Sequence, residues 1–297
     1  MKCADRDIGI RAPEARPEPT ILTALLRLPM SAMVAVSALA GYLAFPGHPV
    51  SLQAALLTTA ILLLAAGCSA LNQVQERAED ALMERTRRRP LPAGRLEPGS
   101  ALAIAGALIA AALLLLGRLE HPIAGWGVGA LLLYNGLYTG LKKRTPFALL
   151  FGALCGALPP LMGWCAAGGD PTDHRIIGLA ALFLLWQVPH TWALSARHPG
   201  DSAGGPFASL FKSLSAARLN RLNQAWLLGL AIATLQLPAF GTLRAPAAQI
   251  LCLGLSFGLL LCAARSTGKH SAQQRSKGLI LYMTTLVCLV IFDNLTV

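Results

Sequence analysis

One short segment concentrates side chains that could hold a metal ion. Asn72, Glu76 and Asp80 follow one another at steps of four residues, directly after the apolar run 52–71. Each step turns an α-helix by about 400°, so the three side chains form one stripe on a helix. An amide and two carboxylates on one face suit a hard divalent cation such as Mg²⁺, which takes oxygen ligands and commonly bridges to substrate phosphates. The spacing therefore predicts a magnesium site.

Basic residues follow this stripe closely. Arg85 and Arg89 belong to the run 85–89, which is rich in arginine. Guanidinium groups bind phosphate oxygens through paired hydrogen bonds, so acids and bases at one place suggest a metal-bound diphosphate between them. By spacing alone, a second interpretation stays open. The segment could be a solvated loop held by surface ion pairs, in which the arginines only fix the topology.

A second basic cluster, formed by Lys142, Lys143 and Arg144, ends another apolar run. These side chains could also reach a phosphate. Taken alone, however, the cluster is explained as well by the preference for basic residues in cytoplasmic loops.

A third group is unusual for its surroundings. Gln187 and His190 interrupt the apolar run 175–195, and ionisable side chains at membrane depth usually face a cavity. Asp201 lies a few residues later, in the glycine-rich segment DSAGGPF. The alternatives are a hydrogen bond between helices for His190 and a turn for Asp201.

The elements that position these residues follow from composition. The chain has 297 residues, of which 55% are hydrophobic and 13% charged, whereas a soluble domain carries about 25% charged residues. Continuous runs of Leu, Ala, Gly and Ile indicate membrane-spanning helices. We expect an all-α, polytopic membrane protein with about nine transmembrane helices in one bundle around a central cavity. The predicted spans are 21–45, 51–72, 100–118, 122–141, 147–168, 175–195, 221–240, 246–264 and 278–296.

The chain is predicted to form a single domain, residues 21–297, after a flexible cytoplasmic tail, residues 1–20. Two loops, 73–99 and 196–220, are longer than the others. The seven cysteines are scattered and form no CxxC pair, which indicates neither disulfides nor a zinc site.

Basic residues set the expected orientation. With the N-terminus in the cytoplasm, 22 of the 25 Lys and Arg residues fall on the cytoplasmic side, and only Arg118, Arg175 and Arg244 fall outside. This is the distribution that the positive-inside rule describes. Topology therefore explains the net charge of +11 better than nucleic acid binding does. The polar clusters share this side, so we expect the site at the cytoplasmic face of the inner membrane.

Together these motifs resemble those of the UbiA-type intramembrane prenyltransferases, and within them the branch that farnesylates haem. The first family motif is matched by Asn72, Glu76, Asp80, Met83, Arg85, Thr86, Arg89, Pro90 and Gly94. Later motifs are matched by Lys142, Lys143, Arg144, Thr145, Gly156, Pro159, Pro160, Gly163, Trp164, Trp186, Gln187, Pro189 and His190. The resemblance covers nearly the whole chain from about residue 20.

The resemblance implies Mg²⁺-dependent transfer of the farnesyl group of farnesyl diphosphate to a vinyl group of haem b, giving haem O, within the lipid bilayer. The implied metal ligands are Asn72, Glu76, Asp80 and Asp201. The implied diphosphate-binding residues are Arg85, Arg89, Lys142 and Arg144. The implied catalytic residues are Asn72, Glu76, Asp80, Lys142 and Lys143. Gln187 and His190 are expected to contact the acceptor, and contacts with other haem-pathway membrane enzymes are left open.

The chain departs from the family pattern at a few positions. Glu76 stands where an aspartate is usual, and Thr191 stands where an aromatic residue is usual. Phe147 and Ala148 replace polar residues, and the segment after Asp201 is short. These departures bear on activity and on the acceptor more than on the fold.

Two other functions stay open. A UbiA-type enzyme with a different acceptor, such as a quinone precursor, would be distinguished by incubation with candidate acceptors. A membrane transporter would place charged residues deep in several spans, whereas here Asp293 is the only clear example.

Overall fold

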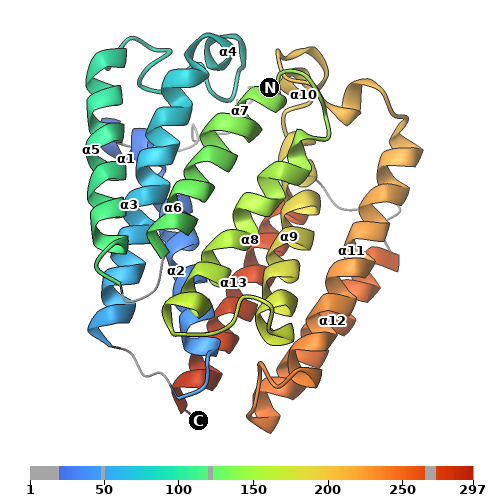
Figure 1. Cartoon of the computed structure of the whole chain (residues 1–297). Coiled ribbons are helices and arrows are strands. Elements are labelled where there is room, and N and C mark those ends of the chain that lie inside the picture. The colour runs from blue at the N-terminus through green and yellow to red at the C-terminus, as the bar shows by residue number, and fades with distance from the viewer. Residues whose placement is uncertain (1–19, 48–50, 120–122, 265–271, 297) are drawn as a thin grey trace, which may run out of the picture.

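Long apolar runs determine the fold, because a chain inside a bilayer must satisfy its backbone groups internally. The computed structural model describes residues 20–47, 51–119, 123–264 and 272–296, and within these ranges it contains helices and no strand (Figure 1). The long helices are α2 (Leu28–Ala44), α3 (Leu52–Gln75), α5 (Pro98–Leu116), α8 (Ala148–Ala166), α9 (His174–Ser195), α11 (Ala216–Ala239), α12 (Pro246–Ala264) and α13 (Ala272–Thr296). The short ones are α1 (Ile21–Leu26), α4 (Arg77–Leu82), α6 (Ile123–Leu131), the π-helix η1 (Leu132–Tyr138), α7 (Thr139–Leu141), α10 (Pro199–Gly204) and the 3-10 helix η2 (Leu210–Lys212).

The predicted all-α membrane class is confirmed. A helix lies in each of the nine predicted ranges, but six helices of the described chain are long and apolar enough to cross a membrane: α3, α5, α8, α9, α12 and α13. Helix α2 is apolar but shorter. Helix α11 begins with the polar sequence AARLNRLNQ, and α6, η1 and α7 divide one range between them. The count of nine crossings therefore stays a prediction. The predicted tail, except for Thr20, lies outside the described residues.

Two successive prolines, Pro159 and Pro160, favour a break or a kink in a helix. Helix α8 continues through both prolines and packs closely on α2. A Cβ atom placed on Gly163 would lie 1.9 Å from the carbonyl oxygen of Ala38, and one on Gly41 would lie 2.0 Å from that of Pro160. Glycine at these positions lets the two helices approach, as small residues commonly do in membrane bundles.

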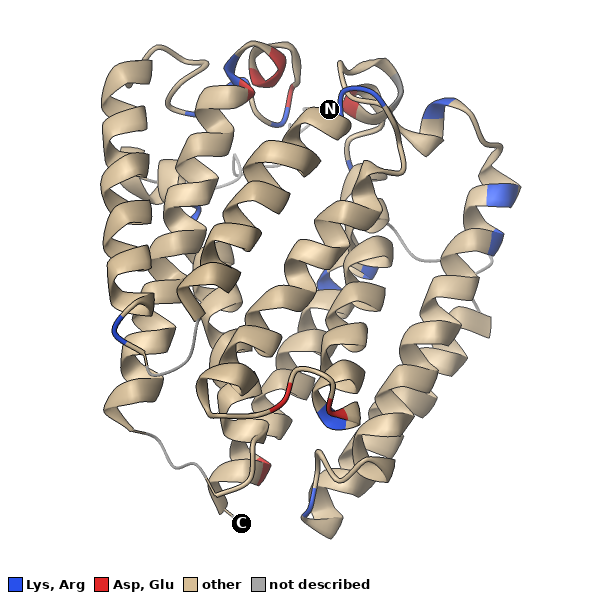
Figure 2. Cartoon of the chain, viewed as in Figure 1, with Lys and Arg blue, Asp and Glu red and all other residues tan. Residues whose placement is uncertain are grey.

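The buried side chains form two large clusters. One joins α2, α3, α5 and α8, and the other joins α9, α11, α12 and α13. The two long loops predicted after α3 and α9 contain the short helices α4 and α10, and these lie at the same end of the bundle, beside the end of α7 (Figure 1). The charged residues on α4, on α10 and after α7 gather at this end (Figure 2), which we call the site end. The first two polar clusters of the sequence and the segment of Asp201 thus lie at one end of the bundle (Figure 1, Figure 2).

Candidate functional site

The predicted stripe of Asn72, Glu76 and Asp80 lies where α3 passes into α4. The three side chains were expected on one continuous helix, but α3 ends at Gln75 and Glu76 separates it from α4. The backbone still links them as a helix would, because Glu76 N–H donates to Asn72 O at 3.0 Å and Asp80 N–H donates to Glu76 O at 2.8 Å. The helical spacing of the three residues is therefore kept across the break between α3 and α4. All three side chains are buried, with exposed fractions of 0%, 1% and 1%.

A hydrogen-bond network fixes the amide of Asn72. The Thr139 hydroxyl donates to Tyr134 O at 2.9 Å, so it can only accept from the Nδ2 of Asn72, 3.1 Å away. This orientation leaves the Asn72 Oδ1 as a buried oxygen with no hydrogen-bond partner among the described residues. A buried carbonyl oxygen without a partner is costly, and a cation ligand would remove that cost. The donor atoms at this position therefore fit Mg²⁺.

Glu76 forms a buried ion pair with Lys142 across 66 positions of sequence. Lys142 Nζ donates to Glu76 Oε2 at 2.6 Å, and it lies over the rings of Tyr138 and Phe207, 5.3 and 4.8 Å from their centroids. Burial raises the pKa of Glu76 and lowers the pKa of Lys142, and each partner's charge opposes the effect on the other. Burial disfavours the charge of each group and the ion pair favours it, so a group that loses its partner needs a new counter-charge.

Asp80 is paired with Arg89 in a similar way. Arg89 Nη1 lies 2.6 Å from Asp80 Oδ2, and the hydroxyl of the fully buried Thr86 donates to Asp80 O at 2.8 Å. Burial lowers the pKa of Arg89 to about 10, the charge of Arg27 acts in the same direction, and Asp80 opposes both. Thr86 and the buried Met83 hold the loop that carries the arginines. Thr86 and Met83 therefore help to position the guanidinium group of Arg89.

The other predicted cations lie at the edge of this site. Lys143 forms an ion pair with Glu79 at 2.6 Å, on the surface of α4. Arg85 and Arg144 are exposed. These side chains have the freedom to close on a ligand that enters from outside.

Asp201 joins two loops at the site end. Its carboxylate oxygens accept hydrogen bonds from the backbone N–H groups of Glu84, at 2.8 Å, and Arg85, at 3.1 Å. These hydrogen bonds bring α10 to the loop that carries the arginines. In this structure, however, the carboxylate is engaged by backbone. Among the described residues, no three His, Cys, Asp or Glu side chains form a ready metal cluster by themselves.

Gln187 and His190 lie on α9 and are not joined to the acids. Within the described ranges, no hydrogen bond or ion pair links either side chain to Glu76 or Asp80. The His190 ring stacks on Trp186, with centroids 4.5 Å apart and planes 11° apart. Its Nδ1 is buried without a described hydrogen-bond partner. The structure thus brings together the first two clusters and Asp201, and leaves the third group separate.

Sequence reasoning missed a ladder of amides between α3 and η1. Gln75 Nε2 donates to Asn135 O at 3.0 Å, and Asn135 Nδ2 donates to Gln75 Oε1 at 3.0 Å and Cys68 O at 3.1 Å. π-Helical turns often occur at functional sites, and η1 carries Asn135 and leads to Thr139. The available signal was the polar Asn135 inside the run GALLLYNGLY.

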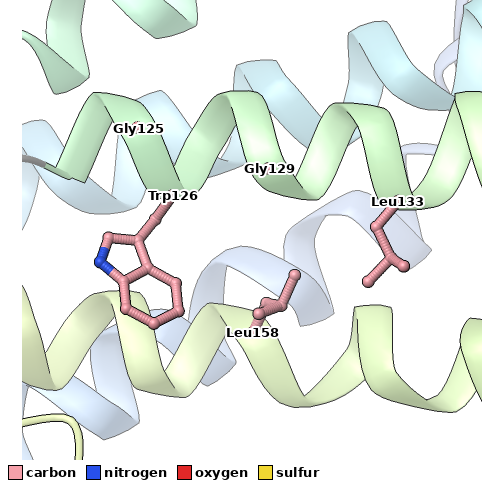
Figure 3. A pocket seen from close by; sticks show the side chains of 5 residues that line it. All are labelled: Gly125, Trp126, Gly129, Leu133 and Leu158. Atoms are coloured by element: carbon pink, nitrogen blue, oxygen red, sulfur yellow. The ribbon is translucent and has the colours of Figure 1, made fainter.

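An apolar cavity lies away from the polar residues of the site. It measures about 530 Å³ and lies between α6, η1 and α8, lined by Gly125, Trp126, Gly129, Leu133 and Leu158. Trp126 and Leu133 point toward α8, and Leu158 points back from it (Figure 3). This lining is apolar, so the groove suits hydrocarbon rather than charge. A central cavity that opens from the ion pairs stays a prediction.

Comparison with known proteins adds an independent finding. The UbiA prenyltransferase family model matches residues 33–286. A protoheme IX farnesyltransferase of Geobacter sulfurreducens is 48% identical over 229 residues, which cover 75% of this chain and 82% of that protein. One of Nitratidesulfovibrio vulgaris (strain DP4) is 36% identical over 272 residues, 90% of this chain and 93% of the relative.

Solved structures share the fold. A UbiA homologue from Archaeoglobus fulgidus bound to GPP and Mg²⁺ superposes with a TM-score of 0.67 at 15% identity, covering 94% of this chain and 100% of that one. At this level of identity the likeness concerns the arrangement of helices alone.

Proposed function

The chain belongs to the UbiA prenyltransferase family, and we propose that it transfers the farnesyl group of farnesyl diphosphate to a vinyl group of haem b, giving haem O. The relatives named protoheme IX farnesyltransferase support this acceptor and donor. The structural observation that carries the proposal is the buried Asn72, Glu76 and Asp80, with Lys142 and Arg89 paired to the two acids. Such a site suits a charged head group at the end of an apolar bundle.

Mg²⁺ is the proposed cofactor. Asn72, Glu76 and Asp80 would hold it, with Asp201 as a further ligand, because Mg²⁺ is usually bound by one or two carboxylates together with substrate phosphates. The unpartnered Oδ1 of Asn72 supports this assignment. When bound, the ion supplies charge neutralisation for the diphosphate oxygens. The Archaeoglobus fulgidus homologue, which shares the fold, binds GPP together with Mg²⁺, and this is consistent with the same cofactor.

The cations of the site would exchange partners when substrate binds. Lys142 and Arg89 are paired with Glu76 and Asp80, the residues proposed as metal ligands. With those carboxylates holding the metal, the two cations would be available for the diphosphate oxygens. Arg85, Arg144 and Lys143 are proposed to approach from the exposed edge. Fixed cations at the leaving group stabilise the charge that develops there.

The reaction proposed is an alkylation followed by hydration. The bond between C1 of the farnesyl group and the diphosphate oxygen breaks, and its electron pair leaves with diphosphate. The π pair of the haem vinyl group forms the new carbon–carbon bond to C1. Water adds to the cationic carbon left on the former vinyl group and loses a proton, which gives the hydroxyethylfarnesyl group. Gln187 and His190 are proposed to contact the haem.

The chain is an integral membrane protein, with six membrane-length apolar helices in its described part. We further propose that it resides in the inner membrane with the site end in the cytoplasm, because 22 of its 25 basic residues fall on one predicted side. A cysteine placed at Gly94 should react with a membrane-permeant maleimide only. Labelling above the background of the native cysteines by an impermeant reagent in sealed cells would reverse the orientation.

The direct test is mass spectrometry of haems in cells whose own haem O synthase is replaced by this chain. We expect haem O to appear, and to disappear in cells that carry an empty vector. Accumulation of haem b alone, with prenylation of another acceptor supplied to the membranes, would contradict the haem assignment.

A further inference from the structure

The break between α1 and α2 places an arginine in an unfavourable backbone conformation. Arg27 has φ 45° and ψ 48°, and it is the one non-glycine residue with positive φ in the described ranges. Side chains with a Cβ atom adopt this left-handed region at a cost that glycine avoids and asparagine reduces. Strained residues of this kind concentrate at functional sites. The break itself does not need an arginine, so its side chain calls for a separate explanation.

A buried glutamine fixes this break onto the candidate site. Gln73 is fully buried, and its Nε2 donates to Leu25 O at 2.6 Å and to Ala24 O at 3.2 Å. Gln73 lies on the last turn of α3, between Asn72 and Glu76 in sequence. The end of α1 is therefore held against the turn that carries the proposed metal ligands, and Arg27 follows that end by one residue.

The charge of Arg27 lies among the ionisable groups of the site. Its positive charge lowers the pKa of Glu76, of Lys142 and of Arg89. Charges in a salt solution interact strongly only at short range. Among the residues that the structure describes, the guanidinium has no hydrogen-bond or ion-pair partner. By contrast, Lys142, Arg89 and Lys143 each pair with a carboxylate at 2.5 to 2.6 Å. Arg27 is therefore a site cation that need not leave a carboxylate before it binds an anion.

We propose that Arg27 is a further diphosphate-binding residue, held at the broken helix so that its guanidinium meets the prenyl diphosphate directly. This inference rests on the proposed function only in requiring a prenyl diphosphate as substrate. It is independent of the acceptor. The left-handed backbone is explained as the conformation that turns the side chain of the α1–α2 junction toward the acids of α3 and α4.

The chain allows a test that separates the charge from the backbone. Arg27→Asn and Arg27→Gly remove the guanidinium while suiting positive φ better than arginine does, so both variants should fold at least as stably. The probe is the farnesyl thiolodiphosphate analogue, which has sulfur in place of the bridging oxygen, with Mg²⁺ and purified protein in nanodiscs. We expect its Kd to rise at least about 10-fold in both variants, the effect of losing a charge-assisted hydrogen bond. The matched control is Arg118→Asn, which removes an exposed arginine at the end of α5 and should leave Kd unchanged.

Equal Kd values for Arg27→Asn, Arg27→Gly and the unmodified chain would overturn the proposal and leave Arg27 as a purely structural residue. A second measurement needs no variant. Phenylglyoxal modification of the unmodified protein, read by mass spectrometry, should be slower at Arg27 when Mg²⁺ and inorganic pyrophosphate are present. Equal modification with and without pyrophosphate would also overturn it.

These outcomes separate the inference from the proposed function. If the unmodified chain binds the thiolodiphosphate but makes no haem O, the haem assignment fails while Arg27 is still judged by its variants. If haem O is made and the Arg27 variants bind the analogue normally, the inference fails alone.

Discussion

The two ends of the bundle use buried acids differently. At the site end, Glu76 and Asp80 are paired with the side chains of Lys142 and Arg89. At the opposite end, which carries the loops after α8 and α11, Asp293 accepts the backbone N–H groups of Arg244 and Ala245, at 2.6 and 2.9 Å. Burial alone does not distinguish them, because Asp293 is 4% exposed and the two site acids are 1% exposed.

The difference teaches that the partner of a buried acid, more than its depth, indicates function. A backbone N–H at a helix start is fixed, so Asp293 can only stabilise the turn that leads into α12. A lysine or arginine has a flexible stem and can move to another anion. Asp293 looked like a transporter feature in the sequence, and its partners explain it as a structural cap. The site end therefore holds charges that can be rearranged, and the opposite end holds charges that cannot.

The largest expected effect comes from removing one of the rearrangeable acids. Asp80→Asn keeps the shape of the side chain but loses the negative charge that is proposed to bind Mg²⁺. We expect product formation to fall by about 100-fold or more, the scale of losing a main electrostatic contact in a transition state. The measurement is haem O formed by purified protein at saturating farnesyl diphosphate.

The matched control is Asp293→Asn, which changes a similarly buried acid at the opposite end. We expect it to lower stability by about 1 kcal/mol, the cost of a weakened cap, with little change in turnover. If Asp80→Asn keeps near-normal activity with Mg²⁺ present, the pairing of a buried acid with a mobile cation does not indicate function, and the comparison of the two ends fails.

Asp201 sharpens the comparison because it lies at the site end yet binds backbone. If Asp201 is a metal ligand, it should affect the Mg²⁺ concentration needed for half-maximal activity. If it only clamps the loop through its hydrogen bonds to backbone N–H groups, it should not. We expect Asp201→Asn to raise the Mg²⁺ concentration for half-maximal activity by about 10-fold, in the range seen when residues around a metal are changed. Glu84→Gln, which alters an exposed acid next to the same loop contact, serves as the control. A loss of activity that excess Mg²⁺ does not restore would leave Asp201 with the clamp role alone.

The sequence predicted what depends on local pattern. Apolar runs predicted the helices, and four-residue spacing placed Asn72, Glu76 and Asp80 on one face even though α3 ends before Glu76. The pairing of Glu76 with Lys142 joins two segments 66 positions apart. Spacing within one helix carries no information about such a contact, so the sequence indicated only that both residues belong to the same side.

Two other features had weak or misleading signals. The left-handed break at Arg27 lacks the glycine or asparagine that normally marks such a position, so the sequence predicts one span over 21–45. Pro159 and Pro160 favour a break or a kink, yet α8 continues through both. Packing against α2 at Gly41 and Gly163 supports the helix there, and neighbouring helices commonly compensate for prolines inside membranes.

The smallest expected effect compares the two histidines of α9, one near each end of the bundle. His190 is partly buried and stacks on Trp186, whereas the side chain of His174 is 65% exposed. If His190 contacts the acceptor, His190→Ala should raise the KM for haem about 5-fold, the loss of one polar contact worth about 1 kcal/mol. Binding of the farnesyl thiolodiphosphate should be unchanged, because no contact links His190 to the acids of α3 and α4. If His190 only joins helices, His190→Ala should instead lower stability by about 1 kcal/mol and affect both substrates alike.

His174→Ala should change the KM of neither substrate, so a rise in the KM for haem in that variant would mean that the assay responds to α9 as a whole. An unchanged KM for haem in His190→Ala would remove the acceptor role, and Thr191, where the family pattern has an aromatic residue, would be the next position to vary.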